Sequence, residues 1–282
     1  MSKKEVIAIQ GERGSYSELA VLKLLGPEIK VSCCENFEEV FQRTEKEKAG
    51  FCLIPIENSL SGSIHKNYDL LLRHDLKIIR EINLQIEHNL IALPGVKFKE
   101  IKTVISHPVA LDQCEKFFKE HTQLTKRSAY DTSGSVKRIM EQKLKDSAAI
   151  AGARAAEYHG AEILRTGVQD NQENFTRFFL LAHESEGGES RNKTSIVFNF
   201  KNTPGALFKC LGAFALRDID LFKIESRPIP GRAWEYLFYM DFLGNPEEER
   251  SRNALKHLEE LTEFLRVLGS YPRDISLEKK RM

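Results

Sequence analysis

The chain has 282 residues, with 42 Lys and Arg against 41 Asp and Glu and a formal net charge of +1. Because the two signs are interspersed, the composition disfavours nucleic acid or an anionic membrane as a partner. No segment approaches the roughly 20 apolar residues that span a bilayer. The five cysteines lack C-x-x-C spacing, so we expect reduced thiols, no metal and no cofactor in a cytoplasmic protein.

The length favours two domains, although a single large α/β domain would also fit. Before residue 183, short apolar runs alternate with helical patterns, which is typical of parallel sheets with crossover helices. Strands are predicted at 6–10, 51–56, 103–106 and 148–151, and helices at 17–25, 37–47 and 110–121.

An extended stretch over 77–93 is long enough to cross between two lobes. If a second crossing follows near 166–174, the first domain consists of two α/β lobes. The cleft between two such lobes is a common position for a ligand.

The polar stretch 183–192 separates two strongly apolar strands and predicts a linker. The pattern after it has the order βαββαβ, which is the ferredoxin-like arrangement. Strands are predicted at 194–200, 221–225, 234–242 and 266–271, and helices at 206–216 and 247–265.

A hydroxyl and a guanidinium, Thr176 and Arg177, interrupt the otherwise apolar strand 174–181. A polar residue in a buried strand needs a partner or a cleft, since leaving it unpaired costs about 1–3 kcal/mol. An ordinary strand with one salt bridge explains the stretch equally well. In a regular strand, Thr176 and Phe178 would share one face and Arg177 would occupy the other.

Polar groups also follow several predicted strands, at the sheet edge where ligands commonly bind. Glu57 comes directly after an apolar strand, so its carboxylate either pairs or has a raised pKa. At 130–135, helix capping and an anion site explain the sequence equally well, whereas capping alone explains Ser106-His107-Pro108. The loop 11–18 matches no nucleotide-binding motif, and a carboxylate site or a helix cap at Ser15 or Ser17 explains it equally well.

Six motifs, in order, resemble those of the prephenate dehydratase family that carries a C-terminal ACT regulatory domain. The resemblance covers nearly the whole chain, with departures at Arg13, Ser15 and Tyr16 in the first loop. The motifs are Pro55-Ile56-Glu57-Asn58-Ser59, Ser106-His107-Pro108, Asp131-Thr132, the Thr-Arg-Phe stretch from Asn174 to Phe178, Gly205-Ala206-Leu207 and Glu225-Ser226-Arg227-Pro228.

The resemblance implies an α/β fold with a two-lobed, periplasmic-binding-protein-like catalytic domain over 1–185. The lobes would be roughly 1–80 with 166–185, and 81–165. A βαββαβ, ferredoxin-like ACT domain would follow over 193–273. Because the first predicted strand begins near Val6, we expect no fused chorismate mutase domain and a monofunctional protein.

The resemblance also implies a reaction, in which prephenate loses carbon dioxide and water to give phenylpyruvate in L-phenylalanine biosynthesis. L-phenylalanine would inhibit at the ACT domain of a homodimer or tetramer. Two alternatives stay open. One is an arogenate dehydratase, whose substrate has an amino group where prephenate has a ketone, and the other is a sensor that binds an amino acid without catalysis.

Residue roles follow from the same resemblance. Thr176 would donate a hydrogen bond to the leaving hydroxyl, with Glu57 as the source of a relayed proton. Arg177 would bind the substrate if its strand bends toward the cleft. The remaining candidates for the substrate are Asn58, Ser59, Thr132, Ser133 and Phe178, and those for L-phenylalanine are Asn202, Gly205, Ala206, Leu207, Glu225 and Ser226.

Overall fold

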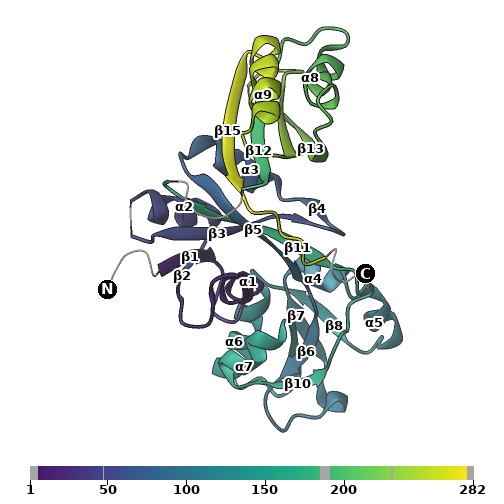
Figure 1. Ribbon diagram of the computed structural model, residues 1–282. Helices are drawn as coiled ribbons and strands as arrows, with labels where there is room; N and C mark the ends of the chain where they lie inside the picture. Colours follow the sequence, from purple (N-terminus) through teal and green to yellow (C-terminus); the bar gives the residue numbers. More distant parts are fainter. Residues whose placement is uncertain (1–5, 47, 185–190, 230, 278–282) are drawn as a thin grey trace. The chain divides into compact units, whose positions relative to one another are not determined.

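The computed structural model describes residues 6–46, 48–184, 191–229 and 231–277, which form three β-sheets with helices packed on them (Figure 1). Contacts divide the chain into two compact units. The first is Met1–Leu70 with Ile82–Phe178, and the second is Leu71–Glu81 with Phe179–Met282. The domain boundaries 1–185 and 193–273 stay a prediction.

The first sheet has the strand order β2-β1-β3-β11-β5, with the short β4 paired to β3. Its central strands are buried on both faces, as fully buried Ile7, Leu53 and Ile54 show. The strands are β1 (Val6–Gln10), β2 (Lys30–Cys34), β3 (Phe51–Asn58), β4 (Gly62–Ser63), β5 (Lys77–Gln85) and β11 (Phe175–Ala182), and the helices are α1 (Tyr16–Leu25), α2 (Phe37–Glu45) and α3 (His65–Arg73).

The second sheet has the order β10-β6-β9-β7-β8. Ala148 and Ile150 of its central strand pack with residues of α4 and α5, while Ala149 and Ala151 pack with residues of α6 and α7. Helices therefore cover both faces. The elements are β6 (Asn89–Ala92), a 3-10 helix (Phe98–Glu100), β7 (Thr103–Ser106), α4 (Pro108–Asp112), α5 (Glu115–Glu120), β8 (Thr125–Ser128), α6 (Thr132–Gln142), β9 (Ser147–Ala151), α7 (Ala153–His159) and β10 (Glu162–Arg165).

The chain passes between these two sheets twice, through 86–88 after β5 and through 166–174 before β11. Both predicted crossings are therefore confirmed, and the α/β fold has two lobes. The predicted parallel pairing is present but the second sheet is mixed, because β7 runs parallel to β8 and β9 while β6 runs antiparallel to both β9 and β10. Side-chain alternation is the same in either strand direction, so the periodicity of a sequence carries no information on direction.

The predicted helix 110–121 is two helices, α4 and α5. The backbone of Cys114, with φ −122° and ψ 30°, is not helical and separates them. Its thiol is completely buried in the core of the second sheet. The helical periodicity continues across this break, which is why the sequence did not reveal it.

The βαββαβ prediction is confirmed in the second compact unit. Its antiparallel sheet has the order β13-β14-β12-β15, and α8 and α9 pack against each other over one shared core. The predicted helix 247–265 is too long, because α9 ends at Leu261 and Leu265 pairs with Phe198 in the sheet. The elements are β12 (Lys193–Asn199), α8 (Ala206–Ala215), β13 (Leu221–Pro228), β14 (Tyr236–Leu243), α9 (Glu249–Leu261) and β15 (Phe264–Tyr271).

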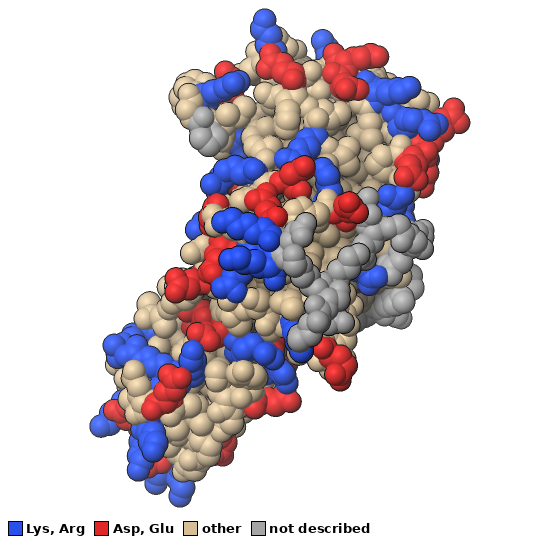
Figure 2. Space-filling view, turned by 90° about the vertical axis from the view of Figure 1, so that its left-hand side faces the viewer, with Lys and Arg blue, Asp and Glu red and all other residues tan. Residues whose placement is uncertain are grey.

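Among the described residues, no helix is long and apolar enough to cross a membrane. On the face drawn in Figure 2, basic and acidic side chains are interspersed over the described residues. This distribution agrees with the near balance of charges in the composition.

Gly14 lies where the loop after β1 meets α7 of the other lobe. Its φ is +81°, and a Cβ at this position would lie 2.8 Å from Cα of Ala155. Backbone cannot move aside as a flexible side chain can, so the two lobes approach each other this closely only because residue 14 is glycine.

We expect Gly14→Ala to destabilise the protein by about 3 kcal/mol, since a left-handed backbone costs about 1–2 kcal/mol and overpacking adds about 1–3 kcal/mol. Gly160 is a control, because its backbone is left-handed, with φ 68° and ψ 29°, but a Cβ added there would have nothing within 4 Å. Gly160→Ala should therefore lose only the backbone part. Equal losses for the two variants in denaturant unfolding would contradict the close approach.

Candidate functional site

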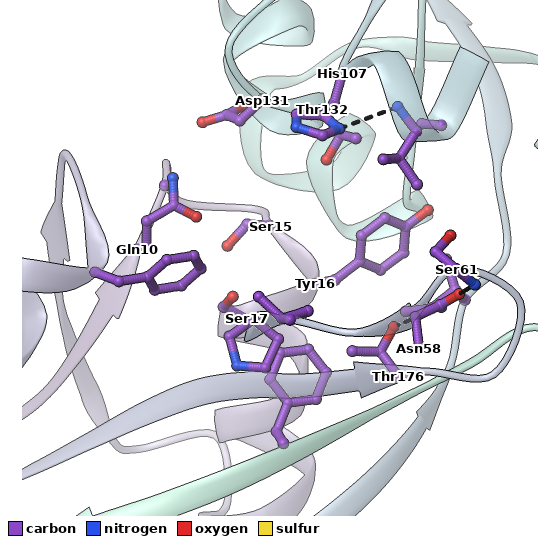
Figure 3. Close-up of a pocket in the computed structure, with 18 of the residues that line it drawn as sticks. Gln10, Ser15, Tyr16, Ser17, Asn58, Ser61, His107, Asp131, Thr132 and Thr176 are labelled. Atoms are coloured by element: carbon purple, nitrogen blue, oxygen red, sulfur yellow. Dashed lines mark hydrogen bonds between the residues drawn. The ribbon is translucent and has the colours of Figure 1, made fainter. Parts of the chain in front are cut away.

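A cavity of about 620 Å³ lies between the two lobes of the first compact unit (Figure 3). The loop after β1, the start of α1 and the end of β3 supply one side, and α4 with the start of α6 supplies the other. This is the cleft that the two-lobed interpretation predicted. Figure 3 shows polar side chains from both lobes converging on it.

The loop after β1 is held by a buried carboxylate. Glu18 is completely buried and accepts hydrogen bonds from Arg13 Nε at 2.6 Å and from the backbone N–H of Gly14. Ser15 caps α1 by accepting from Glu18 N at 3.3 Å. These bonds place Ser15, Tyr16 and Ser17 on the cavity wall, where the sequence had suggested a binding loop.

Thr176 lies on the cavity wall beside Asn58. Asn58 Nδ2 lies 3.0 Å from Thr176 Oγ1 and 2.8 Å from Asn174 Oδ1, and Asn58 Oδ1 accepts from the backbone N–H groups of Leu60 and Ser61. The amide of Asn58 is thereby oriented from both sides. Since Thr176 Oγ1 accepts this bond, its own proton stays available to a molecule in the cavity.

Gln113 joins the two lobes through the same network. Its Oε1 accepts from Asn174 Nδ2 at 2.9 Å, and its Nε2 donates to Ser61 Oγ at 3.2 Å. His88 Nε2 lies 2.9 Å from Oε1 of Gln113, and Tyr16 OH lies 2.8 Å from His88 Nδ1. A continuous chain of polar contacts therefore runs from Thr176 to Tyr16.

The protonation of this chain follows from its geometry and burial. Because Oε1 of Gln113 is an acceptor, the facing Nε2 of His88 carries the proton, and Nδ1 shares the single hydroxyl proton of Tyr16 with Glu87 O, which lies 2.7 Å from the hydroxyl. Burial lowers the pKa of His88 and raises the pKa of Tyr16 well above its ordinary value. Both groups are therefore neutral near pH 7.

At the other wall, His107 and Asp131 cap α4 and α6. His107 Nδ1 accepts from Val109 N at 3.2 Å, and Asp131 Oδ1 accepts from Gly134 N. Burial lowers the pKa of His107 and raises the pKa of Asp131. His107 was interpreted as a cap alone, but it also lines the cavity.

The structure brings together four of the predicted substrate-site residues, namely Asn58, Thr132, Thr176 and Phe178. Thr176 and Phe178 share the cavity side of β11, as strand alternation predicted. Phe178 is only 2% exposed, so it contributes an apolar floor to the cavity rather than a mobile side chain.

Arg177 is not among the residues that line the cavity. Residues 175–182 form a continuous strand, so alternation turns Arg177 away from the face that carries Thr176. The predicted contact of Arg177 with substrate depended on a bend in this strand, and with a regular strand it stays a prediction. Sequence periodicity alone could not show whether that bend exists.

Glu57 is not among the lining residues either, and its role as the source of a relayed proton stays a prediction. The strand β3 continues through residue 58, and Glu57 pairs with Ser63 of β4. The carboxylate was expected to project from a strand end, but backbone pairing with β4 holds the residue within the sheet.

Ser59 and Ser133 are also outside the set of lining residues and hold the scaffold instead. Ser59 Oγ donates to Glu173 O at 3.0 Å and accepts from Phe175 N at 2.9 Å. Ser133 Oγ donates to Arg13 O at 2.5 Å. These bonds connect separate elements, and the contact of Ser59 and Ser133 with substrate stays a prediction.

Several lining residues were missed by the sequence analysis because they belong to no recognised motif. They include Gln10, Asn36, Lys66, His88 and Gln113. Asn174, which belongs to the Thr-Arg-Phe stretch, is completely buried and is not among the lining residues. Among the described lining residues, Lys66 is the only Lys or Arg and Asp131 is the only Asp or Glu.

The residues predicted to bind L-phenylalanine all lie in the second compact unit. Gly205, with φ +77°, caps α8, and Ala206 and Leu207 form its first turn after Asn202. Glu225 and Ser226 belong to β13 at the edge of the sheet. Their role stays a prediction. No group of three or more His, Cys, Asp or Glu in the described part of the chain is arranged to hold a metal ion.

A comparison with known protein families identifies the family to which the chain belongs. The model of the prephenate dehydratase family matches residues 7–186. The chain belongs to this family. Its members include arogenate dehydratase/prephenate dehydratase 2, chloroplastic, from Arabidopsis thaliana, which is 45% identical over 282 residues that cover 96% of this chain and 74% of the relative.

Two solved structures extend the comparison. Prephenate dehydratase from Arthrobacter aurescens in complex with L-Phe is 30% identical, with a TM-score of 0.87 over 95% of this chain and 90% of that one. GqqA, described as a novel type of quorum quenching acylase, is 31% identical, with the same TM-score of 0.87 over 95% and 98% of the chains. The Arabidopsis relative is named as chloroplastic, so the comparisons do not support the predicted cytoplasmic location.

Proposed function

We propose that this member of the prephenate dehydratase family removes carbon dioxide and water from arogenate and from prephenate, giving L-phenylalanine and phenylpyruvate respectively. The observation that carries the proposal is the hydroxyl of Thr176, which lies on the wall of an interlobe cavity and accepts a hydrogen bond from Asn58. The Arabidopsis relative, which is named for both activities, supports the inclusion of arogenate.

The reaction needs little covalent help from the protein. The bond between the ring and its carboxylate breaks, the electron pair moves through the ring, and the bond to the hydroxyl at the opposite ring carbon breaks. The departing hydroxide takes up one proton and leaves as water. Because aromatisation drives the reaction, the protein has to orient the substrate and stabilise the departing oxygen.

Thr176 supplies that stabilisation. Asn58 donates to Oγ1, which polarises the hydroxyl and directs its proton toward the leaving oxygen. The cavity is poor in cations, with Lys66 alone among its described Lys and Arg residues. A scarcity of cations suits the reaction, because a cation held on the ring carboxylate would stabilise the substrate more than the transition state as charge leaves it.

We also propose that L-phenylalanine inhibits the reaction through the βαββαβ module, acting as an ACT domain in a homodimer or tetramer. The support is the Arthrobacter relative, whose structure is a complex with L-Phe. Coupling of this kind is reciprocal and amounts to about 1–3 kcal/mol. The inhibitor should therefore weaken substrate binding by about 5- to 150-fold at saturation.

Purified protein should convert both substrates, with phenylpyruvate followed by its absorbance in alkali and L-phenylalanine by chromatography. Added L-phenylalanine should slow the prephenate reaction. Conversion of neither substrate would refute the proposed reaction, and if L-phenylalanine still bound, the sensor interpretation would replace it. Conversion that L-phenylalanine does not slow would refute only the proposed regulation.

A further inference from the structure

One wall of the cavity carries the carboxylate of Asp131. Within the described residues no Lys or Arg forms an ion pair with it, and Lys137, whose pKa its charge helps to raise, pairs with Glu12 instead. Figure 3 shows Asp131 near His107 and Thr132, on the wall away from Thr176 and Asn58. A ring that presents its hydroxyl to Thr176 would therefore direct its opposite end toward Asp131.

Helix capping accounts for only some of the hydrogen bonds that this carboxylate can accept. Oδ1 accepts from the N–H of Gly134, while a Cβ on Gly11 would lie 3.4 Å from Oδ2. The backbone of Glu12 also donates to the group, yet burial dominates and raises the pKa of Asp131. A buried acceptor that retains lone pairs toward a cavity favours a ligand that donates protons or carries positive charge.

The neighbouring histidine does not neutralise this wall. Burial lowers the pKa of His107, so the imidazole is neutral near pH 7. Its Nδ1 accepts from Val109 N, which leaves the proton on Nε2. His107 can donate a hydrogen bond here, but Asp131 keeps the only full charge on this wall among the described lining residues, since Lys66 belongs to α3 of the other lobe.

Arogenate and prephenate differ at the end of the molecule that this wall would meet. Arogenate has an ammonium where prephenate has a ketone. The ketone has no N–H or O–H group that could donate a hydrogen bond to a carboxylate. We propose that Asp131 is a specificity-determining residue that binds the ammonium of arogenate and so favours arogenate over prephenate. This inference rests on the proposed function and names the group that separates its two substrates.

Asp131→Asn tests the charge without removing the cap, because Asn caps helices as well as Asp does. A hydrogen bond to a charged group is worth about 10- to 100-fold in an equilibrium. We expect kcat/KM for arogenate to fall by about 10- to 100-fold, with the value for prephenate unchanged within about 3-fold or increased. Asp146→Asn is the control, because Asp146 Oδ1 accepts from Ser147 Oγ at 3.0 Å and Asp146 does not line this cavity.

The same preference for arogenate over prephenate should appear in binding affinities measured without turnover. In the background of Thr176→Val, calorimetry should find that Asp131→Asn weakens the binding of arogenate and not that of prephenate. Equal losses for both substrates, or no loss for arogenate, would overturn the role of Asp131 while leaving the proposed reaction intact. A wild-type protein that converts neither substrate would instead refute the reaction and this inference with it.

Discussion

Replacing Thr176 by Val lowers kcat by about 10²- to 10³-fold and changes KM by less than about 3-fold, which is the expected cost of losing one donor to a departing oxygen. Valine keeps the shape of threonine and removes the hydroxyl. Asn58 Nδ2 keeps Asn174 Oδ1 and Phe175 O as acceptors, so the fold should not be disturbed. Steady-state kinetics with arogenate and prephenate measure the effect.

Thr176→Ser is the matched control, because serine keeps the hydroxyl. It should retain kcat within about 10-fold, since the cost there is one of positioning rather than of losing the donor. Thermal unfolding of both variants should match that of the wild type. A near-normal kcat for Thr176→Val would remove Thr176 from the mechanism.

Replacing Lys193 by Met destabilises the second compact unit by about 3–5 kcal/mol, because it removes a cation from a buried carboxylate. Lys193 Nζ lies 3.0 Å from Glu81 Oε2, and the two side chains are 7% and 1% exposed. Oε1 of Glu81 also accepts from Asp274 N at 3.0 Å. The loss should appear as a lower midpoint in denaturant unfolding followed by circular dichroism.

The double variant Glu81→Gln with Lys193→Met should recover at least half of that stability. The glutamine amide keeps an oxygen that accepts from Asp274 N, and because it is neutral it needs no cationic partner. Arg232→Met is a control in the same unit, since Arg232 and Glu235 pair at 3.2 Å while 61% and 48% exposed, and loss of such a surface pair costs less than about 1 kcal/mol. A loss as small for Lys193→Met would show that the buried pair contributes little.

The sequence predicted helices and strands correctly where the buried residues recur at the spacing of a helix or a strand. The strands β1 and β7 have the predicted bounds, because short apolar runs are flanked by turn residues. The edge strand β8 escaped prediction since Thr125–Ser128 is exposed throughout and shows no alternation. Helix α7 was missed as well, being a short alanine-containing segment with little apolar pattern.

The same distinction applies to the residues of the candidate site. Motifs pointed to Asn58, Thr132, Thr176 and Phe178, which line the cavity. His88 and Gln113 have no motif, and only the crossing of the chain between lobes brings them within hydrogen-bond distance of each other. Contacts between residues far apart in sequence leave no periodic signal, so neither could be found from spacing.

Local periodicity and short motifs were enough to predict the two α/β lobes, the βαββαβ module and a threonine for the leaving hydroxyl. Which neighbours of that threonine face the cavity became clear only from the folded chain. The fold turns Arg177 and Glu57 away and brings Asp131 to the opposite wall. Strand continuation and the docking of two lobes set these orientations, and both depend on backbone pairing between distant segments.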